Sequence, residues 1–461
     1  MGEKTNKTEL IKWGISILCT ILILLIPTNE IFTLQIRNYI AITLGVVCVV
    51  AFSLLDFVFP AILLPCLYVI FGCASMDVAF SGWTAAAPIM VLGAYILTNI
   101  LDECGLLRRI AYWCILKCPK SFSGLLIGIF LAGFVLSVIT SCNAFTVMPA
   151  LGVGICQALN LKKSKESALV MGAVLLSTCT VMTFVYDPSV MGLINEAMQQ
   201  VIPGFQVGWL QFFLQNCPML LFCLLTLILF IKIMKPTITI NNTDTEYFFN
   251  EYKKMGKMSS DEKKAGLVTI CLLVYMVTIP IHGLEMQWGF IFAPFLLYLP
   301  GFKVGSAQAI QKTNFSMVLF TVACIGIGKV SISLGLGSIL SELLLPLLKG
   351  ISTTGVLYIV WAASGLINFL FTPIAIVAAF SAPLVQVAVD LGIGPLGVLY
   401  TIILGGEVIL LPYEVVPYLI IFGFGYMRMS DFIKLMLIKT AAMAVFIPLV
   451  MFPFYKIIGI L

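Results

Sequence analysis

The sequence predicts an all-α integral membrane protein with about eleven transmembrane helices and two re-entrant hairpins in two inverted repeats. Of its 461 residues, 61% are hydrophobic and only 10% are charged, whereas a soluble domain usually carries about 25% charged residues. Apolar runs such as 13–27, 39–55 and 219–234 approach the roughly 20 residues needed to cross a bilayer. There is too little polar surface to coat a water-soluble globule of this length, so the chain must lie in a membrane.

The expected crossings are apolar stretches separated by polar or glycine-rich turns. They lie near 13–27, 39–55, 57–74, 86–102, 168–200, 210–234, 266–282, 288–301, 314–335, 396–425 and 430–455. The first begins like a signal peptide, with Lys4, Lys7 and Lys12 before an apolar run. It lacks an A-x-A-like cleavage site and further spans follow, so we interpret it as the first transmembrane helix.

Two other apolar stretches, 122–160 and 352–390, fit a single crossing poorly. Both are too long for one span and carry polar residues or proline near the middle. This pattern is typical of a hairpin that enters and leaves the membrane on the same side. If both are hairpins and the N-terminus is cytoplasmic, all lysines and arginines fall on the cytoplasmic side except Arg37, Lys349, Lys456 and the intramembrane Lys329. That asymmetry obeys the positive-inside rule and supports the topology.

Four parts follow from this order. Residues 1–38 hold the N-terminal tail and first helix, 39–234 the first repeat, 235–265 a polar cytoplasmic linker, and 266–461 the second repeat. Each repeat has a Gly-Leu step, an amphipathic stretch, a hairpin (about 122–160 and 352–390) and a helix broken at a proline (about 168–200 and 396–425). An odd number of spans in each repeat gives the two repeats opposite orientations. Secondary transporters use such inverted repeats with broken helices to build a midplane site.

The C-terminal stretch Leu411–Lys434 (LPYEVVPYLIIFGFGYMRMSDFIK) resembles the divalent anion:sodium symporter family, whose members carry dicarboxylates, citrate or sulfate. Segments 93–111, 147–151 and 382–391 are also similar, and the order of features agrees over nearly the whole chain. The resemblance implies eleven spans, two re-entrant hairpins, a scaffold that makes a homodimer and an elevator-like transport motion.

The same resemblance implies where substrate binds, because the family carries Ser-Asn-Thr at each hairpin tip and Thr-Pro-Pro-Asn at each helix break. Counting back from Pro149 and Pro383 places the tips at 139–141 and 373–375. Neither holds the family triplet, so no residue is assigned to a sodium site. The candidate substrate-binding residues are those that keep a polar group near a tip or stand at a break, namely Thr140, Ser141, Asn143, Thr372, Pro188 and Pro417.

Four charged residues are expected at membrane depth: Asp187, Glu407, Glu414 and Lys329. Each costs about 2.5–3.5 kcal/mol at a helix centre on insertion scales, so such residues are usually functional. One interpretation is ion coupling, in which a carboxylate carries a proton through the transport cycle. The alternative is that some lie near the interface, or that Lys329 simply pairs with a carboxylate.

We therefore expect a secondary active transporter in the plasma or inner membrane, moving a small mono- or dicarboxylate-like anion or a related polar metabolite. Proton coupling and exchange are the leading modes, and sodium-coupled dicarboxylate or sulfate symport is the alternative. A channel and a membrane-embedded enzyme are more distant alternatives. The chain has one histidine, no CxxC pair, no phosphate-binding loop and no H-E-x-x-H motif, so we expect no enzyme activity, no cofactor and no nucleic-acid partner.

Overall fold

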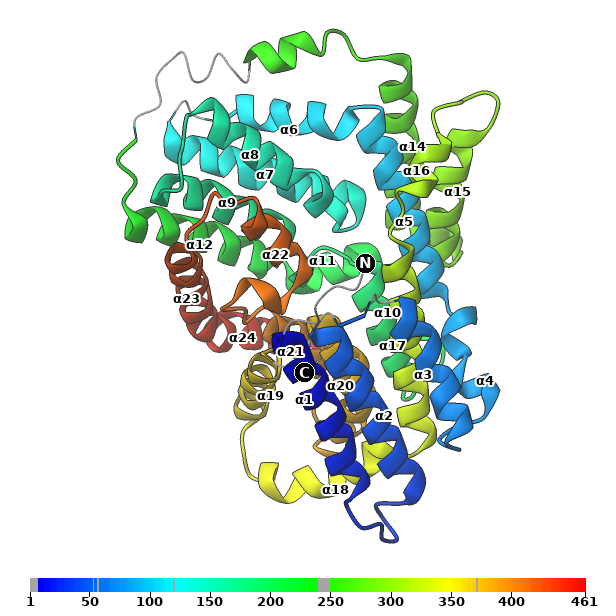
Figure 1. Ribbon diagram of the computed structural model, residues 1–461. Coiled ribbons are helices and arrows are strands. Elements are labelled where there is room, and N and C mark those ends of the chain that lie inside the picture. The colour runs from blue at the N-terminus through cyan, green and yellow to red at the C-terminus, as the bar shows by residue number, and fades with distance from the viewer. Residues whose placement is uncertain (1–6, 53, 56–57, 119–120, 239–248, 370–371) are drawn as a thin grey trace.

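The computed structural model describes residues 7–461 except 53, 56–57, 119–120, 239–248 and 370–371 (Figure 1). These described residues form helices and turns without a strand, so the predicted helical membrane class is confirmed. Within them, seven helices are long and apolar enough to cross a membrane, or up to nine if each bent pair is one span. The expected total of about eleven also includes shorter helices such as Val58–Ile70 and Met286–Tyr298, and it stays a prediction.

The first half of the chain runs from a membrane helix through a hairpin to a broken helix. Its elements are α1 (Lys7–Leu24), α2 (Leu34–Ala51), α3 (Val58–Ile70), α4 (Met76–Ala79), η1 (Ser81–Thr84), α5 (Ala86–Glu103), α6 (Leu106–Leu116), α7 (Phe122–Thr140), η2 (Asn143–Thr146), α8 (Met148–Ala158), α9 (Lys165–Thr178), η3 (Thr180–Thr183), α10 (Pro188–Met198), α11 (Trp209–Asn216) and α12 (Pro218–Met234).

The second half repeats this order. Its elements are α14 (Ser260–His282), α15 (Met286–Tyr298), α16 (Ala307–Gln311), α17 (Phe315–Ser333), α18 (Leu336–Leu348), α19 (Thr353–Ile367), α20 (Pro373–Asp390), α21 (Pro395–Gly406), η4 (Pro412–Glu414), α22 (Val416–Gly423), α23 (Met429–Phe446), η5 (Ile447–Met451) and α24 (Phe452–Ile457).

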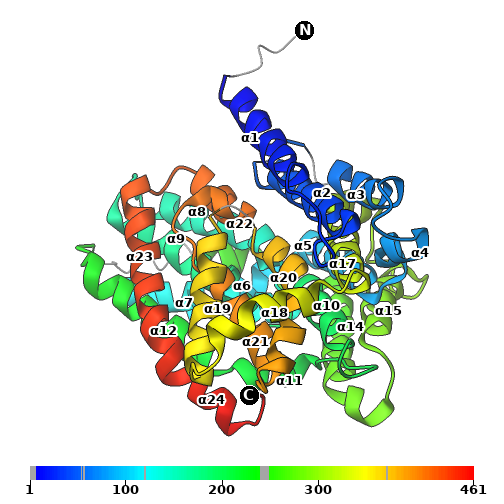
Figure 2. The same cartoon turned by 90° about the horizontal axis from the view of Figure 1, so that it is seen from below.

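A left-handed glycine turns the chain out of the membrane helix at the same point in each half. Gly105 (φ 85°) lies between α5 and α6, and Gly335 (φ 66°) lies between α17 and α18. A residue with a Cβ would be strained at these angles. Figure 1 shows α6 crossing the top of the molecule and α18 crossing the bottom. The two amphipathic arms therefore lie on opposite faces, and in Figure 2 α18 runs across the front while α1 stands at the margin.

The first hairpin turns a few residues later than the sequence count placed it, and the second turns a few residues earlier. α7 continues to Thr140, so the first turn occupies 141–147 and not 139–141. α19 ends at Ile367 and α20 begins at Pro373, so the second turn lies between these helices, and its described residues are 368, 369 and 372. The expectation of a tip at 373–375 was wrong, because Pro373 is preorganised for a first helical turn and Thr372 caps that turn.

The inner segments of the two broken helices form the centre of the molecule. Every residue of α9 from Glu166 to Thr178 is buried, and so is every residue of α21 from Leu396 to Gly406. α9 leads through η3 to a break before Pro188, and α21 leads to a break before Val416. Backbone groups freed at membrane depth are tolerated only inside protein or beside a cavity, so these breaks mark the place to look for a site.

Candidate substrate site

Both hairpin turns and both helix breaks open onto one cavity of about 200 Å³. Of the six substrate-binding residues predicted from sequence, five line it: Ser141, Asn143, Thr372, Pro188 and Pro417. Thr140 lies outside the lining, because it belongs to the last turn of α7 and its hydroxyl donates to the Leu136 carbonyl at 2.7 Å. Segments separated by more than 200 residues therefore meet at one buried space.

Three helices begin at this cavity. Pro188 starts α10, Pro373 starts α20, and Val416 starts α22, and all three residues belong to the cavity lining. Proline suits a first helical turn because its missing N–H would have no partner there. The N-terminal end of a helix carries a partial positive charge and free N–H groups, which favour an anion. The local sequence thus places three positive helix ends at a cavity whose described lining holds no lysine or arginine.

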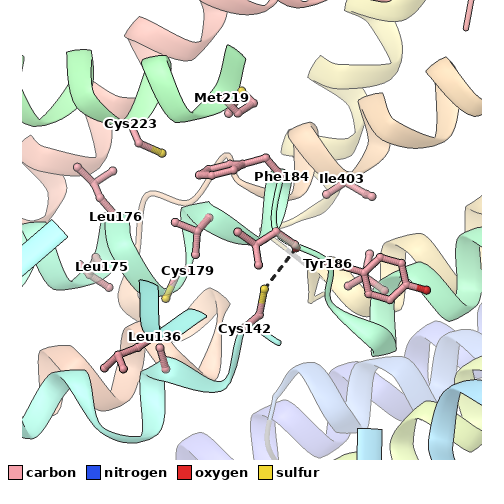
Figure 3. Packing of buried hydrophobic residues seen from close by; sticks show 14 of the residues in the cluster. Leu136, Cys142, Leu175, Leu176, Cys179, Phe184, Tyr186, Met219, Cys223 and Ile403 are labelled. Atoms are coloured by element: carbon pink, nitrogen blue, oxygen red, sulfur yellow. Dashed lines mark hydrogen bonds between the residues drawn. The ribbon is translucent and has the colours of Figure 1, made fainter. Parts of the chain in front are cut away.

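The first hairpin is fastened to the first helix break. The Cys142 thiol donates to the Val185 carbonyl at 3.4 Å, as the dashed line in Figure 3 shows. Farther along the same arm, the Ser137 hydroxyl donates to the Ser177 carbonyl at 3.0 Å. Cys142 adopts a left-handed conformation (φ 69°), which turns its side chain back toward the break. These bonds fix Ser141 and Asn143 at the cavity wall.

The second hairpin is fastened to the second break by Asn368, a residue that sequence reasoning missed. Its Nδ2 donates to the carbonyls of Gly406 and Val408, each at 3.2 Å, and the residue is 1% exposed. Its Oδ1 has no hydrogen-bond partner among the described residues. The signal for Asn368 was a polar residue at the start of the interruption within 352–390. Counting from Pro383 placed the hairpin tip after this residue, so Asn368 was not considered.

Asp187 and Glu414 both hold backbone N–H groups at the breaks. Oδ1 of Asp187 accepts from the Ser189 amide at 2.8 Å and from the Ser189 hydroxyl at 2.5 Å, so Asp187 is the N-cap of α10. Glu414 accepts from the amides of Leu411 at 2.7 Å and Leu410 at 3.2 Å. Asp187 lines the cavity and Glu414 does not.

Glu407 also lines the cavity, and it belongs to a buried polar triad with Lys439 and Tyr418. Lys439 Nζ lies 3.0 Å from Glu407 Oε2 and 2.9 Å from the Tyr418 hydroxyl, and that hydroxyl lies 3.3 Å from the carboxylate. The Lys439 side chain is 0% exposed. The charge count that assigned Lys439 to the cytoplasmic side was therefore wrong. The sequence did contain a signal for a buried charge here, because Lys439 lies inside the apolar run of α23, just as Lys329 lies inside the apolar run of α17.

Lys329 lies away from this cavity. It forms an ion pair with Glu196 across the boundary between α17 and α10, and both residues line a separate, very small pocket. Lys329 is therefore paired with a carboxylate, as the alternative interpretation of this charge expected. Of the four intramembrane charges, the structure brings Asp187 and Glu407 to the site and leaves Glu414 and Lys329 outside its lining.

The charge of the described lining is therefore negative, with Asp187 and Glu407 present and no lysine or arginine among the lining residues. The described residues hold no group of three His, Cys, Asp or Glu side chains that could bind a metal ion. The charge of a bound anion would have to be compensated by the helix ends, by protonation of Asp187 or Glu407, or by Lys439, which lies behind Glu407 and Tyr418 of the lining.

Comparison with known proteins supplies a family and a fold. The family model for citrate transporters matches residues 39–405. A comparison with curated proteins finds no match. Among solved structures, the chain is similar to the YdaH transporter of Alcanivorax borkumensis, described as having an unusual topology. The TM-score is 0.59 at 16% identity, over 83% of this chain and 87% of that one. The expected kinship with membrane anion transporters is thereby confirmed.

Proposed function

Because the chain belongs to the citrate transporter family, we propose that this membrane transporter carries a small organic carboxylate, with citrate as the first substrate to test. The observation that carries this proposal is the one cavity onto which both hairpin turns and both helix breaks open. A site assembled from paired interruptions is the arrangement that lets a secondary transporter bind substrate at the midplane.

The chemistry of the lining suits a carboxylate whose charge is partly neutralised. The N-termini of α10, α20 and α22 attract an anion, and hydroxyl and amide groups such as Ser141, Asn143 and Thr372 can hydrogen-bond its oxygens. Asp187 and Glu407 repel it while they are ionised. Proton uptake by these carboxylates removes this conflict, whereas in exchange of one anion for another both anions meet the same repulsion and the helix ends must offset it. We therefore propose proton-coupled transport or exchange, and sodium coupling remains the alternative.

An elevator-like motion fits the contacts. The hairpins are bonded to the helix breaks through Cys142 and Asn368, so these segments can move as one body. Their boundary with α5 and α17 holds small residues: a Cβ on Gly192 would meet the Ala87 Cβ at 2.1 Å, and one on Gly328 would meet the Ala378 carbonyl oxygen at 3.8 Å. Small residues let helices approach closely, and small sliding of packed helices is one of the known ways in which domains move.

The test is uptake of radiolabelled citrate by proteoliposomes. Three conditions are compared: an inward proton gradient, an inward sodium gradient, and internal unlabelled citrate without any gradient. Uptake driven by protons or by internal citrate supports the proposal. Uptake that follows sodium and ignores pH contradicts proton coupling and favours the symporter alternative. Flux that neither saturates nor shows counterflow would indicate a channel.

A further inference from the structure

The triad of Glu407, Lys439 and Tyr418 has the arrangement of a switch between a proton and an anion. Glu407 and Tyr418 line the cavity, whereas Lys439 stands directly behind them with no exposed side-chain surface. Its ammonium has three N–H donors, and Glu407 and Tyr418 engage it at 3.0 and 2.9 Å. It is a buried cation in contact with two residues that line the proposed site.

We propose that the coupled proton and the substrate carboxylate exchange places at Lys439. A proton taken up from water bonds to Glu407 Oε2, and the carboxyl group becomes neutral. The ion pair between Glu407 and Lys439 is then lost, and the Lys439 ammonium pairs with a carboxylate of the substrate. One proton enters for each anion bound, and release of the anion restores the pair. This inference rests on the proposed transport of a carboxylate.

Electrostatics makes the exchange mutually dependent. A charge removed from water into a protein interior is stable only when it is paired, so Lys439 needs either ionised Glu407 or an anion. Without the proton, Lys439 is already compensated by Glu407, so no cation offsets the repulsion between Asp187 and an anion. With the proton but no anion, Lys439 is left unpaired and buried. Proton and anion therefore bind together or not at all.

The surroundings of the triad leave Glu407 as the group that accepts the proton. Tyr418 on α22, Cys179 at the end of α9, and Cys223 on α12 interact with the pair. Glu414 interacts with Lys439 from η4, but two backbone amides already hold its carboxylate. α19 and α20 pack against this end of α21 with Ser364 and Pro373, which do not titrate. Asp187 lies on the opposite helix break as the cap of α10.

The first test measures the citrate affinity of four purified proteins at about pH 6 and about pH 8: wild type, Glu407→Gln, Lys439→Gln and the double variant. Uptake of one proton changes the ratio of protonated to unprotonated protein tenfold for each pH unit. Ionisation of citrate itself is common to all four proteins, so ratios between variants isolate the protein group. We expect the affinity of Glu407→Gln relative to wild type to rise at least about tenfold from the lower to the higher pH. Lys439→Gln should lose at least about tenfold in affinity at both.

The double variant separates a functional pair from a structural one. Replacing both partners of a buried pair by neutral groups often restores stability, so we expect the double variant to fold and still fail to bind citrate. Recovery of citrate binding in the double variant would overturn the proposal, and so would an unchanged pH slope in Glu407→Gln. Lys312→Gln, which removes a partly exposed ion pair with Glu103 outside the cavity lining, is the matched control.

A second measurement follows the proton directly. At about pH 6, the infrared difference spectrum between wild-type protein with and without isotope-labelled citrate should gain a protein carboxylic acid band that Glu407→Gln lacks. An identical band in both proteins would place the proton elsewhere and overturn the inference. Wild-type protein that binds no citrate at either pH would instead contradict the proposed substrate, so the two failures are distinct.

Discussion

The ammonium of Lys439 lies 3.0 Å from the Glu407 carboxylate at a point where the lysine side chain has no exposed surface. Removing one partner of such a pair strands the other charge, which typically costs about 3–5 kcal/mol. We therefore expect Lys439→Met to lower the free energy of unfolding by that amount, and adding Glu407→Gln to recover most of it. Denaturation in detergent measures both. Lys312→Met, at a pair whose lysine is 58% exposed, should cost less than about 1 kcal/mol.

The contact between α10 and α5 depends on Gly192. A Cβ at this position would lie 2.1 Å from the Ala87 Cβ, which no repacking of a flexible side chain can relieve. Gly192→Ala should therefore reduce stability by about 1–3 kcal/mol and slow citrate uptake. Gly14→Ala is the control, because that glycine lies inside α1 with nothing within 4 Å. Equal behaviour of the two variants would mean that α10 does not pack on α5 in this way.

Arg109 fastens the end of the linker to α6. Its guanidinium donates to both carboxylate oxygens of Glu262, at 2.7 and 3.1 Å, and to the carbonyls of Met255 and Gly256. A lysine keeps the charge but cannot make this forked set of bonds. In Arg109→Lys, the contact between the linker and α6 should lose about 1–2 kcal/mol of stability. The population of the locally opened state, and with it the rate of limited proteolysis in the linker, should then rise about 5- to 30-fold. The exposed neighbour Arg108 gives the control variant Arg108→Lys.

The two amphipathic arms should report the orientation of the halves. Lys257 follows Gly256, whose carbonyl is bonded to Arg109 of α6, and Lys349 directly follows α18; both lysines are exposed. Figure 1 shows α6 and α18 on opposite faces. In a variant without the 14 native cysteines, Lys257→Cys should react with an impermeant maleimide only from inside the cell and Lys349→Cys only from outside. Labelling of both from one side would contradict the predicted topology.

Sequence reasoning reached the fold because apolar length, charge asymmetry and paired breaks are local signals. It placed some of the lining residues for the same reason, since Pro188 and Pro417 mark helix breaks that are visible in the sequence. It missed Asn368 because a turn was located by counting from Pro383, and helix starts do not keep a fixed distance from a later proline. It missed Lys439 because a charge count cannot tell a cytoplasmic lysine from one buried against a carboxylate 32 residues earlier.

Asp187 provides the sharpest comparison with Glu407, since both carboxylates line the cavity but have different partners. Asp187 caps α10 through the Ser189 amide, and asparagine caps a helix about as well as aspartate. Asp187→Asn should therefore keep its stability within about 0.5 kcal/mol while removing a negative charge from the site. At about 7 Å and an effective dielectric constant of about 40, that charge is worth roughly 1 kcal/mol, so citrate affinity should rise about 5- to 10-fold.

The pH dependence of citrate binding should survive in Asp187→Asn, because the proton that accompanies the anion binds at Glu407. Ser189→Ala, which removes one hydrogen bond to Asp187 and leaves its charge, is the control and should not gain affinity. Citrate titrations of both variants at about pH 6 and about pH 8 make the comparison. A flat pH profile in Asp187→Asn would identify Asp187 as the proton carrier, and the negative charge it places in the cavity would then be the one that transport must neutralise.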